Sequence, residues 1–528
     1  MGKYLNPGNL PFKESIGSKI YVDKTGLISY INQIIGTKQK FICSSRPRRF
    51  GKSMAIEMLV AYYSIGCTSE ELFRNLEIVK DDSFEINLNK YDVLRIDVQW
   101  LRSNAERAEQ TVPMLQEQVL QELRETYGQY ISEKSTSISM ALSDIFTATG
   151  KQFVILIDEW DCLFRLDKGN TALQEEYIEF LRGMFKGAQA EEFVAFAYMT
   201  GILPIKKYGT ESALNNFREF TMLNPSVLSE YVGFTEKEVK ELCQTYQMDY
   251  KEMEHWYDGY KFRRVEHVYS PKSIVECLLN EEFENYWTST ETYESLKIYI
   301  EMNFDGLKDA VITMLGGGRQ SINPRTFQND MQTFKNKDDI LTLLIHLGYL
   351  AYDYETKEVF IPNQEIHSVF QDAVENSTWN EVIKAIENSK NLLEATLQKE
   401  GEVVAKAIEL VHEETTSILN YNNENSLSCV ISLAYYSARN DYILIREFPA
   451  GKGFADIVFL PRKCSTKPAL VVELKWDKSV EGAIAQVQNK HYGNILRDYT
   501  GNVLCVGINY NKKDKKHTCV IEEYVAIV

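Results

Sequence analysis

Two stretches of this chain carry side chains suited to phosphate chemistry, and the first spans residues 44–53. It reads Ser-Ser-Arg-Pro-Arg-Arg-Phe-Gly-Lys-Ser, follows a short apolar run at 41–42 and precedes a helical pattern at 54–63. Backbone N–H groups at the start of that helix, the ammonium of Lys52 and a Mg²⁺ ion on the Ser53 hydroxyl would together hold a triphosphate. The last three residues match the end of a Walker A motif, although an arginine replaces its usual first glycine. A solvated basic turn is the alternative interpretation.

An apolar run at 153–157 leads into two adjacent acids further along the chain. Such a run predicts a buried parallel strand, whose C-terminal end delivers Asp158 and Glu159 to a crevice at the edge of a sheet. Asp158 would hold Mg²⁺ directly or through water, and Glu159 would polarise the attacking water. Two solvated acids that cap a buried strand are the alternative, which the Walker-like loop at 44–53 disfavours.

Further strands and helices alternate around these two segments. Strands are expected at 93–98 and 193–201, and helices at 105–133 and 171–188. This alternation predicts a parallel sheet with helices on both faces. Thr200 would then close the strand beside the one that carries the acids, where its hydroxyl could sense the γ-phosphate. An ordinary strand-end hydroxyl fits the pattern equally well.

Several other segments have a structural interpretation. Residues 23–25 (Asp-Lys-Thr) predict a helix-capping turn. Arg218 falls in an expected helical segment, where it could act as an arginine finger. An ordinary surface arginine is the favoured interpretation. A helix followed by a hairpin at 338–370 predicts a winged-helix-like module, whose acidic turn favours a lid or interdomain role over DNA reading. Residues 372–420 predict charged helices that lead into the last domain.

The second chemical stretch lies near the C-terminus, where the pattern predicts three successive strands joined by turns, at 442–448, 451–459 and 470–476. Because side chains alternate along a strand, Glu473 and Lys475 point to the same side. If Asp456 lies on that side too, two carboxylates and an ammonium converge, which is the arrangement that phosphodiester hydrolysis requires. The acids would bind Mg²⁺, the metal would lower the pKa of a water, and the lysine would orient that water or steady developing charge. Gln486, on a helix expected at 480–496, would face the site. A strand of alternating salt-bridged residues is the alternative.

Length and charge limit the organisation and partners of the chain. Its 528 residues exceed what one hydrophobic core usually serves, so roughly two to four domains are expected. A net charge of −17 repels phosphate backbones, so any contact with nucleic acid must be local. Local positive charge in the last domain comes from Lys490, His491, Lys512, Lys513, Lys515 and Lys516.

Composition also bears on the compartment. The nine cysteines include no Cys-x-x-Cys pair, which fits reduced thiols and gives no zinc pattern. No run approaches the length of a membrane span, and residues 1–17 lack the apolar core of a signal peptide. We therefore expect a soluble, cytoplasmic protein with no membrane partner.

The two chemical stretches together resemble known families. Three segments are similar to the predicted AAA-ATPase-like family common in gut and anaerobic bacteria: 21–25, 46–53 and 156–161. That family has the same Arg-Pro-Arg-Arg-Phe-Gly-Lys form of the loop, so the arginine in place of glycine counts less against nucleotide binding. Three others look like the PD-(D/E)XK nuclease domain that the family usually carries at its C-terminus: 454–456, 473–475 and 486–492. The resemblance implies ATP binding at Lys52 and Ser53, Mg²⁺ at Asp158, and a nuclease metal at Asp456 and Glu473.

The predicted architecture is an α/β protein in three parts. An AAA-like P-loop (ASCE) ATPase domain would occupy 1–230, a helical lid with a winged-helix-like region 231–371, and a restriction-endonuclease-like α/β domain 372–528. The predicted nucleotide-binding residues are Arg46, Arg49, Gly51, Lys52, Ser53, Asp158 and Thr200. The predicted catalytic residues are Glu159, Asp456, Glu473, Lys475 and Gln486. The predicted metal ligands are Ser53, Asp158, Asp456 and Glu473.

The leading functional hypothesis is an ATP-binding, AAA-like switch coupled to a Mg²⁺-dependent nuclease that acts on DNA or RNA, in defence or mobile-element biology. One rival is an interaction or signalling switch whose nuclease-like domain holds a partner and cuts nothing. Another is an ATPase motor that remodels proteins. The choice between DNA and RNA, the rate of ATP hydrolysis and an oligomeric state are left open by the sequence.

Overall fold

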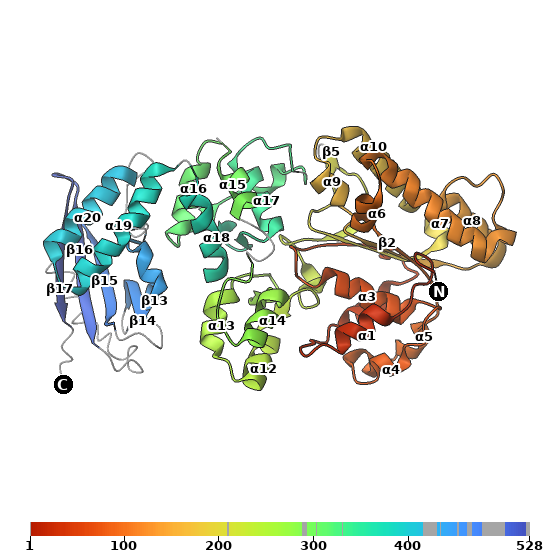
Figure 1. Ribbon diagram of the computed structural model, residues 1–528, viewed down its shortest axis with the longest axis horizontal. Coiled ribbons are helices and arrows are strands. Elements are labelled where there is room, and N and C mark those ends of the chain that lie inside the picture. The colour runs from red at the N-terminus through yellow and green to blue at the C-terminus, as the bar shows by residue number, and fades with distance from the viewer. Residues whose placement is uncertain are drawn as a thin grey trace. The chain divides into compact units, whose positions relative to one another are not determined.

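The fold is that of a computed structural model, which describes the chain except at residues 1, 209–210, 288–292, 303, 330, 378, 416–429, 433, 451–452, 462–466, 478–501 and 524–528. The chain divides into two compact units (Figure 1). Unit 1 comprises Met1–Tyr286 and Ser321–Asn363, and unit 2 comprises Trp287–Gln320 and Gln364–Val528. Each unit contains a five-stranded β-sheet, and each sheet carries one of the predicted sites.

Unit 1 is built around a parallel sheet with the strand order β2-β3-β4-β1-β7. Its strands are β1 (Phe41–Ser45), β2 (Asp92–Asp97), β3 (Phe153–Asp158), β4 (Val194–Gly201) and β7 (Arg218–Phe220). β4 lies between β1, which leads into the Walker-like loop, and β3, which ends in Asp158. Because the strands are parallel, their carboxyl ends meet at one edge, where ligands of such sheets bind.

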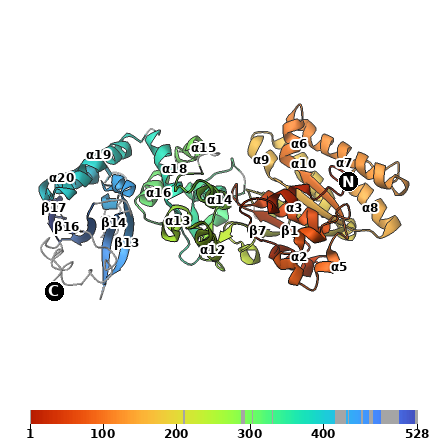
Figure 2. The same ribbon diagram turned by 60° about the horizontal axis from the view of Figure 1, so that its bottom comes forward.

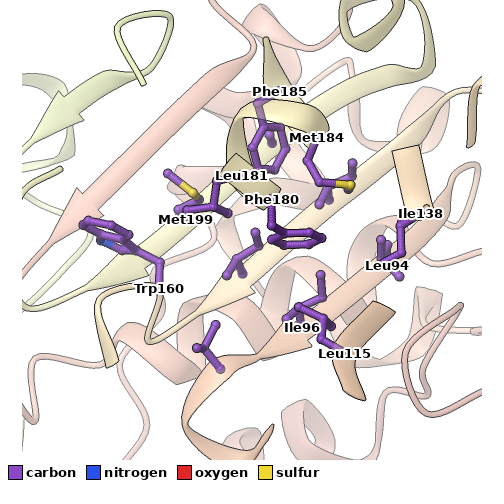
Figure 3. Close-up of a cluster of buried hydrophobic side chains, with 14 of the residues drawn as sticks. Leu94, Ile96, Leu115, Ile138, Trp160, Phe180, Leu181, Met184, Phe185 and Met199 are labelled. Carbon is purple, nitrogen blue, oxygen red and sulfur yellow. The ribbon is translucent and has the colours of Figure 1, made fainter. Parts of the chain in front are cut away.

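Helices cover both faces of this sheet (Figure 2). One face packs against α1 (Leu10–Ile16), α2 (Gly26–Ile34), α3 (Lys52–Tyr63), α4 (Glu70–Phe73) and α5 (Phe84–Asn87). The other packs against α6 (Val98–Asn104), α7 (Thr111–Tyr127), α8 (Ile138–Thr149), α9 (Cys162–Leu166), α10 (Thr171–Phe185) and α11 (Ala188–Phe193). Strand side chains alternate between the two cores, so Leu156 faces the first and Ile155 the second. Figure 3 shows the second core, where Leu94 and Ile96 gather with Phe180 of α10.

The rest of unit 1 is mainly helical. A third core holds α12 (Glu236–Tyr246), α13 (Tyr250–Tyr257) and α14 (Pro271–Asn280). Two short strand pairs are β5 (Lys207–Tyr208) with β6 (Glu211–Ser212), and β8 (Phe234–Thr235) with β9 (Val268–Tyr269). Further on, α17 (Lys337–Leu347) leads into the hairpin of β11 (Ala351–Asp353) and β12 (Glu358–Phe360). The helix and hairpin expected for the winged-helix-like region are therefore present.

Unit 2 contains a mixed sheet with the strand order β13-β14-β15-β16-β17. Its strands are β13 (Tyr442–Ala450), β14 (Gly453–Pro461), β15 (Ala469–Trp476), β16 (Val503–Asn511) and β17 (Lys516–Glu523). Only β15 and β16 pair in parallel. Its helices are α15 (Tyr293–Ile300), α16 (Leu307–Leu315), α18 (Gln364–Glu375), α19 (Asn380–Leu397) and α20 (Gly401–Thr415). Figures 1 and 2 show α19 and α20 along one face of the sheet.

The predicted fold class is confirmed: the chain is α/β, with a parallel P-loop-type sheet, a helical middle and a C-terminal α/β domain. Two local predictions were wrong. The helix expected at 105–133 is the shorter α7, which starts just before Pro113 because proline is tolerated only in a first helical turn. Arg218 opens strand β7 rather than lying on a helix, and its exposed guanidinium donates to the Tyr30 hydroxyl at 3.0 Å.

Two findings concern cysteines and membranes. The cysteines that the structure describes are all free thiols, at positions 43, 67, 162, 243, 277, 505 and 519. In the described ranges, none of the helices combines the length and the apolar character that crossing a bilayer demands.

Candidate nucleotide and metal sites

The Walker-like loop joins the buried strand β1 to the start of α3. Gly51 caps α3 with a φ of 82°, a left-handed conformation that glycine adopts without strain. Lys52 begins the helix and is 5% exposed. Its ammonium donates to the Pro47 carbonyl at 2.9 Å, so the loop wraps around one buried cation. A phosphate cradle needs this combination of a helix N-terminus and an enclosed positive charge.

The acids that end β3 lie beside this ammonium. Glu159 Oε1 is 3.9 Å from Lys52 Nζ. The Ser53 hydroxyl hydrogen bonds to the Asp158 carboxylate, so the two predicted Mg²⁺ ligands are in contact. Burial raises the pKa of Asp158 to about 6 and lowers the pKa of Lys52. A divalent cation would favour the ionised Asp158, and a hydroxyl with a carboxylate is a donor set that suits Mg²⁺.

Arg165 on α9 is a residue of this site that the sequence-based reasoning missed. It is 8% exposed, forms an ion pair with Glu159, and has its Nε 3.0 Å from Asp161 Oδ2. The same oxygen of Asp161 accepts the backbone N–H groups of Ile202 and Leu203, just after β4. Arg165 therefore fixes the Glu159 carboxylate, while Asp161 fastens the end of β3 to the end of β4. The i, i+4 spacing of Asp161 and Arg165 was the signal available in the sequence.

Arg46, which replaces the usual glycine of the loop, is fully buried. Its Nη1 donates to the carbonyls of Ser45 and Phe220, at 2.9 and 3.0 Å. Its guanidinium carbon lies 5.5 Å from the centre of the Phe262 ring, and burial lowers the pKa of Arg46 to about 10. Arg46 thus packs behind the loop, against the segment that follows α13. Its predicted part in nucleotide binding stays a prediction.

Two neighbouring loop residues reach the same helical region. Arg49 Nη1 donates to the Tyr286 carbonyl at 2.9 Å. The Phe50 ring meets the Tyr260 ring edge to face, with centroids 5.4 Å apart. The Tyr260 hydroxyl in turn donates to the Gly348 carbonyl, at the end of α17, at 2.6 Å. The loop is therefore joined to the start of the winged-helix-like hairpin through two aromatic rings.

Thr200 lies at the end of β4, beside β3. It is fully buried, and its hydroxyl donates to the Ser44 carbonyl at 3.1 Å. Its own carbonyl accepts the backbone N–H of Trp160 at 3.0 Å. Thr200 thus links three strand ends within the sheet, and its role as a γ-phosphate sensor stays a prediction.

The segment 23–25 forms a turn before α2. Asp23 Oδ1 accepts both the backbone N–H and the hydroxyl of Thr25, at 2.8 and 2.7 Å. The capping prediction was wrong, because none of the described side chains of this turn forms a capping hydrogen bond to α2. The Lys24 ammonium instead pairs with Glu238 of α12 at 2.7 Å. The turn therefore also ties the sheet domain to the helices of the third core.

A cavity of about 730 Å³ opens in front of the loop. Its polar lining includes Arg49, Gly51, Lys52, Ser53 and Glu159. Its lining also includes apolar and aromatic side chains, at Ile20, Tyr21, Val22, Tyr231, Phe234, Val275 and Leu279. A cavity with both cationic and apolar groups suits a nucleotide, because the phosphates and the base have opposite requirements.

The second site lies on the neighbouring strands β14 and β15. Their antiparallel register, continued by one residue, sets Asp456 opposite Glu473. Asp456 Oδ2 accepts the backbone N–H of Leu474 at 2.6 Å, and Lys475 Nζ is 3.1 Å from Glu473 Oε1. The structure therefore brings the two acids and the lysine of the expected nuclease site together.

The donors of this second site fit a hard divalent cation. Glu473 is 1% exposed, and burying a carboxylate costs free energy unless positive charge compensates it. Lys475 supplies one positive charge against two carboxylates, so this group of three keeps an excess of negative charge. Carboxylate oxygens are the ligands that Mg²⁺ and Mn²⁺ prefer, and Asp456 and Glu473 would hold such an ion. Gln486, Lys490, His491 and the helix expected at 480–496 lie outside the described residues.

Known protein families match both ends of the chain. Residues 12–210 match the family described as predicted AAA-ATPase, and residues 422–520 match the PD-(D/E)XK nuclease superfamily. The two matches therefore show a chain that combines an AAA-ATPase-like domain with a domain of the PD-(D/E)XK nuclease superfamily. The resemblance drawn from the motifs is confirmed.

Individual relatives are more distant. A protein of Azotobacter chroococcum mcd 1 that bears the name "Uncharacterized protein in vnfD 5'region" is 28% identical over 285 residues, 52% of this chain and 51% of its own length. The chain thus spans about half the length of that relative. Among solved structures, the Aeropyrum pernix ORC2 protein in ADPNP-ADP complexes aligns with a TM-score of 0.30 and 10% identity, over 68% of this chain and 97% of that one. A TM-score of this size does not establish a shared fold.

Proposed function

We propose that this chain is an ATP-binding, AAA-like ATPase coupled to a Mg²⁺-dependent nuclease that cleaves DNA or RNA. The observation that carries the nuclease half is the convergence of Asp456, Glu473 and Lys475 on paired strands. The ATPase half is supported by the enclosed ammonium of Lys52, which lies beside Glu159 in the polar lining of the cavity.

The groups of the second site divide the work of phosphodiester hydrolysis. Asp456 and Glu473 would hold Mg²⁺, which when bound supplies a Lewis acid and lowers the pKa of a water. Lys475, held by Glu473, would donate a hydrogen bond to the attacking water or to the negative charge that develops on the phosphate. The backbone N–H of Leu474 orients the Asp456 carboxylate for this task.

The groups of the first site suit phosphoryl transfer. Lys52 would exchange the Pro47 carbonyl for a phosphate oxygen, while Ser53 and Asp158 would hold Mg²⁺. Glu159, positioned by Arg165, would orient the attacking water. In the proposal, ATP binding orders the loop and repositions the lid, and this change exposes or assembles the nuclease site.

The test measures cleavage of plasmid, linear and single-stranded DNA and of RNA, with Mg²⁺ and with or without ATP. It compares wild type with Asp456→Asn and with the control Asp441→Asn, because Asp441 pairs with Lys467 elsewhere in unit 2. We expect only Asp456→Asn to abolish cleavage. Absence of both cleavage and calorimetric Mg²⁺ or Mn²⁺ binding in wild type would leave the interaction switch as the better account. ATP turnover indifferent to nucleic acid would favour the remodelling motor.

Three finer predictions belong to the same proposal. The family resemblance suggests a bacterial setting in defence or mobile-element biology, and the composition suggests a cytoplasmic location. Assembly into an oligomer is compatible with both halves of the mechanism. Size-exclusion chromatography with light scattering, with and without ATP, would determine the oligomeric state.

A further inference from the structure

The turn between β16 and β17 concentrates positive charge on an otherwise acidic protein. It carries four exposed lysines: Lys512, Lys513, Lys515 and Lys516. With the single acid Asp514 they give the turn a net charge of +3, against −17 for the whole chain. Among the residues that the structure describes, no carboxylate forms an ion pair with any of these four ammonium groups. The turn therefore presents charge that is available to a ligand.

The backbone of this turn is held in place without using the lysine side chains. Within 511–516, Asn511 and Asp514 each accept a backbone N–H two residues ahead, at 2.9 and 3.2 Å. Asp477, just after β15, accepts the backbone N–H of Lys512 at 2.6 Å. The turn is thus fixed to the end of the strand that carries the nuclease lysine. Such preorganisation lowers the entropy lost when a ligand binds.

The strand register sets this turn at the end of a polar row that begins at the nuclease site. Lys475 pairs with Asn509 on β16, which pairs with Thr518 on β17, and Asn511 pairs with Lys516. Cross-strand partners project from the same face of a sheet. One face therefore presents Glu473, Lys475, Asn509, Thr518 and Lys516.

The opposite face of the sheet is covered by a helix. His517 alternates with Lys516 and Thr518, and its ring lies 4.9 Å from the ring of His412 on α20. Figure 1 shows α20 against the strands β16 and β17. The polar row consequently projects from the face of the sheet opposite His517, together with the acids of the nuclease site. Lys516 and Thr518, on the edge strand β17, also line a pocket with Lys406 of α20.

We propose that the turn 512–516 is the phosphate-backbone-binding element of the nuclease domain. This inference rests on the proposed function, because it takes the group at Asp456, Glu473 and Lys475 to cut a phosphodiester. From Lys475 the turn is about 7 Å away along the strands and about 10 Å away across two strand spacings. The combined separation of about 12 Å corresponds to about three or four base steps of a duplex strand. Phosphate contacts position a strand without reading its sequence, so binding at the turn is sequence-independent and salt-sensitive.

The test measures binding by fluorescence anisotropy of labelled duplex DNA, single-stranded DNA and RNA to the full chain, in EDTA and over a salt series. The variant Lys513→Gln/Lys515→Gln removes two charges from the turn. The control Lys90→Gln/Lys390→Gln removes two exposed charges, one just before β2 and one on α19. We expect the turn variant to bind about 10- to 100-fold more weakly at about 0.1 M salt, with a slope of log K against log salt reduced by about 2. The control should match wild type.

A third protein, Lys475→Ala, separates this inference from the proposed function. If it binds nucleic acid as wild type does, but wild type never cleaves with Mg²⁺ or Mn²⁺, the nuclease proposal fails and the binding role of the turn stands. If the turn variant binds with unchanged affinity and salt slope while wild type cleaves, the inference is overturned and the nuclease stands. Absence of binding by wild type to all three nucleic acids also overturns it. Matching circular dichroism spectra exclude misfolding as the cause of weaker binding.

Discussion

The two sites differ in how their charged groups are paired and exposed. At the Walker-like loop, Lys52 is buried against a carbonyl of its own loop, and Glu159 is held by Arg165. At the C-terminal sheet, Glu473 is buried beside Lys475, but the row that starts there runs out to exposed lysines. The charged groups of the first site are bonded to other groups of the same site. Those of the second site belong to a polar row that ends at exposed lysines.

This difference determines what each site gains from its ligand. Because Lys52 already donates to an oxygen, a phosphate must replace that partner, and the net gain is the difference between two hydrogen bonds. Under the proposed function, this exchange of partners predicts nucleotide binding of moderate strength. At the second site, the exposed lysines of the turn 512–516 would attract a phosphate backbone over a longer range.

The largest effect should come from Lys475→Ala. Loss of a group that orients water or stabilises developing charge typically lowers kcat by about 100- to 10,000-fold, and ATP binding should be unchanged. Gel-based cleavage kinetics with Mg²⁺ would measure it. Lys467→Ala is the matched control, because Lys467 lies just before β15 but pairs with Asp441. Full cleavage by Lys475→Ala would remove this lysine from the mechanism.

The next effect concerns the ion pairs that Arg165 forms at the first site. Arg165→Met would leave the buried carboxylate of Asp161 without its cation, while the half-buried Glu159 keeps only Lys52, 3.9 Å away. Breaking a buried ion pair costs about 3–5 kcal/mol of unfolding free energy. Urea denaturation would measure the loss. Arg74→Met, which breaks only an exposed pair with Glu71, should cost less than about 1 kcal/mol. Equal losses in the two variants would show that the buried network does not stabilise the site.

Lys52→Ala should have a smaller effect, on affinity alone. A hydrogen bond to a charged group contributes about 1.5–3 kcal/mol, so ATP should bind about 10- to 100-fold more weakly by titration calorimetry. Any cleavage that wild type shows without ATP should be unchanged in this variant, because the two sites use different residues, whereas the effect of ATP on cleavage should be weakened. Lys38→Ala, which changes an exposed lysine, is the control. Unchanged affinity would refute the assignment of the phosphate loop.

The smallest effect is a pH dependence in unit 2. Burial lowers the pKa of His412 to about 4 and that of His517 to about 3, below the ordinary value near 6.5. Their neutral forms therefore stabilise the fold fully above about pH 6.5, and this contribution is lost as pH falls towards 4, by at most about 1.4 kcal/mol per pH unit for each histidine. Thermal unfolding at about pH 7.5 and 5 would show it. In His412→Phe the dependence should be weaker, and an unaltered dependence would contradict the explanation.

Local patterns were enough to predict the parts of both sites that lie within one element. The strand, loop and helix at 41–63 and the apolar run before Asp158 depend on neighbouring residues, and both are present. Strand β7 was missed because three residues carry no readable period and pair with β1 across the fold. The alternation of Glu473 and Lys475 was readable, but the position of Asp456 depends on a register that a slip of one residue would reverse.

Partners that meet only in the folded chain could not be predicted in the same way. The i, i+4 pair of Asp161 and Arg165 was visible in the sequence, but nothing in its spacing showed that the same arginine also holds Glu159. The bond from Lys24 to Glu238 likewise joins segments that are distant in sequence. Such contacts follow from how helices are placed on a sheet, which local periodicity does not specify.

The edge-to-face pair of Phe50 and Tyr260 has a thermodynamic consequence. Since the Tyr260 hydroxyl also donates a hydrogen bond to the Gly348 carbonyl, a shift of the loop in the proposed nucleotide binding would reach the start of the hairpin. Such coupling is reciprocal. A macromolecule that binds the hairpin would change the affinity of the protein for nucleotide by a certain factor, and nucleotide would change the affinity for that macromolecule by the same factor. The hairpin would then respond to nucleotide bound at the distant loop. Nucleotide should change the rate of amide hydrogen exchange at residues 349–353 in wild type but not in Phe50→Leu.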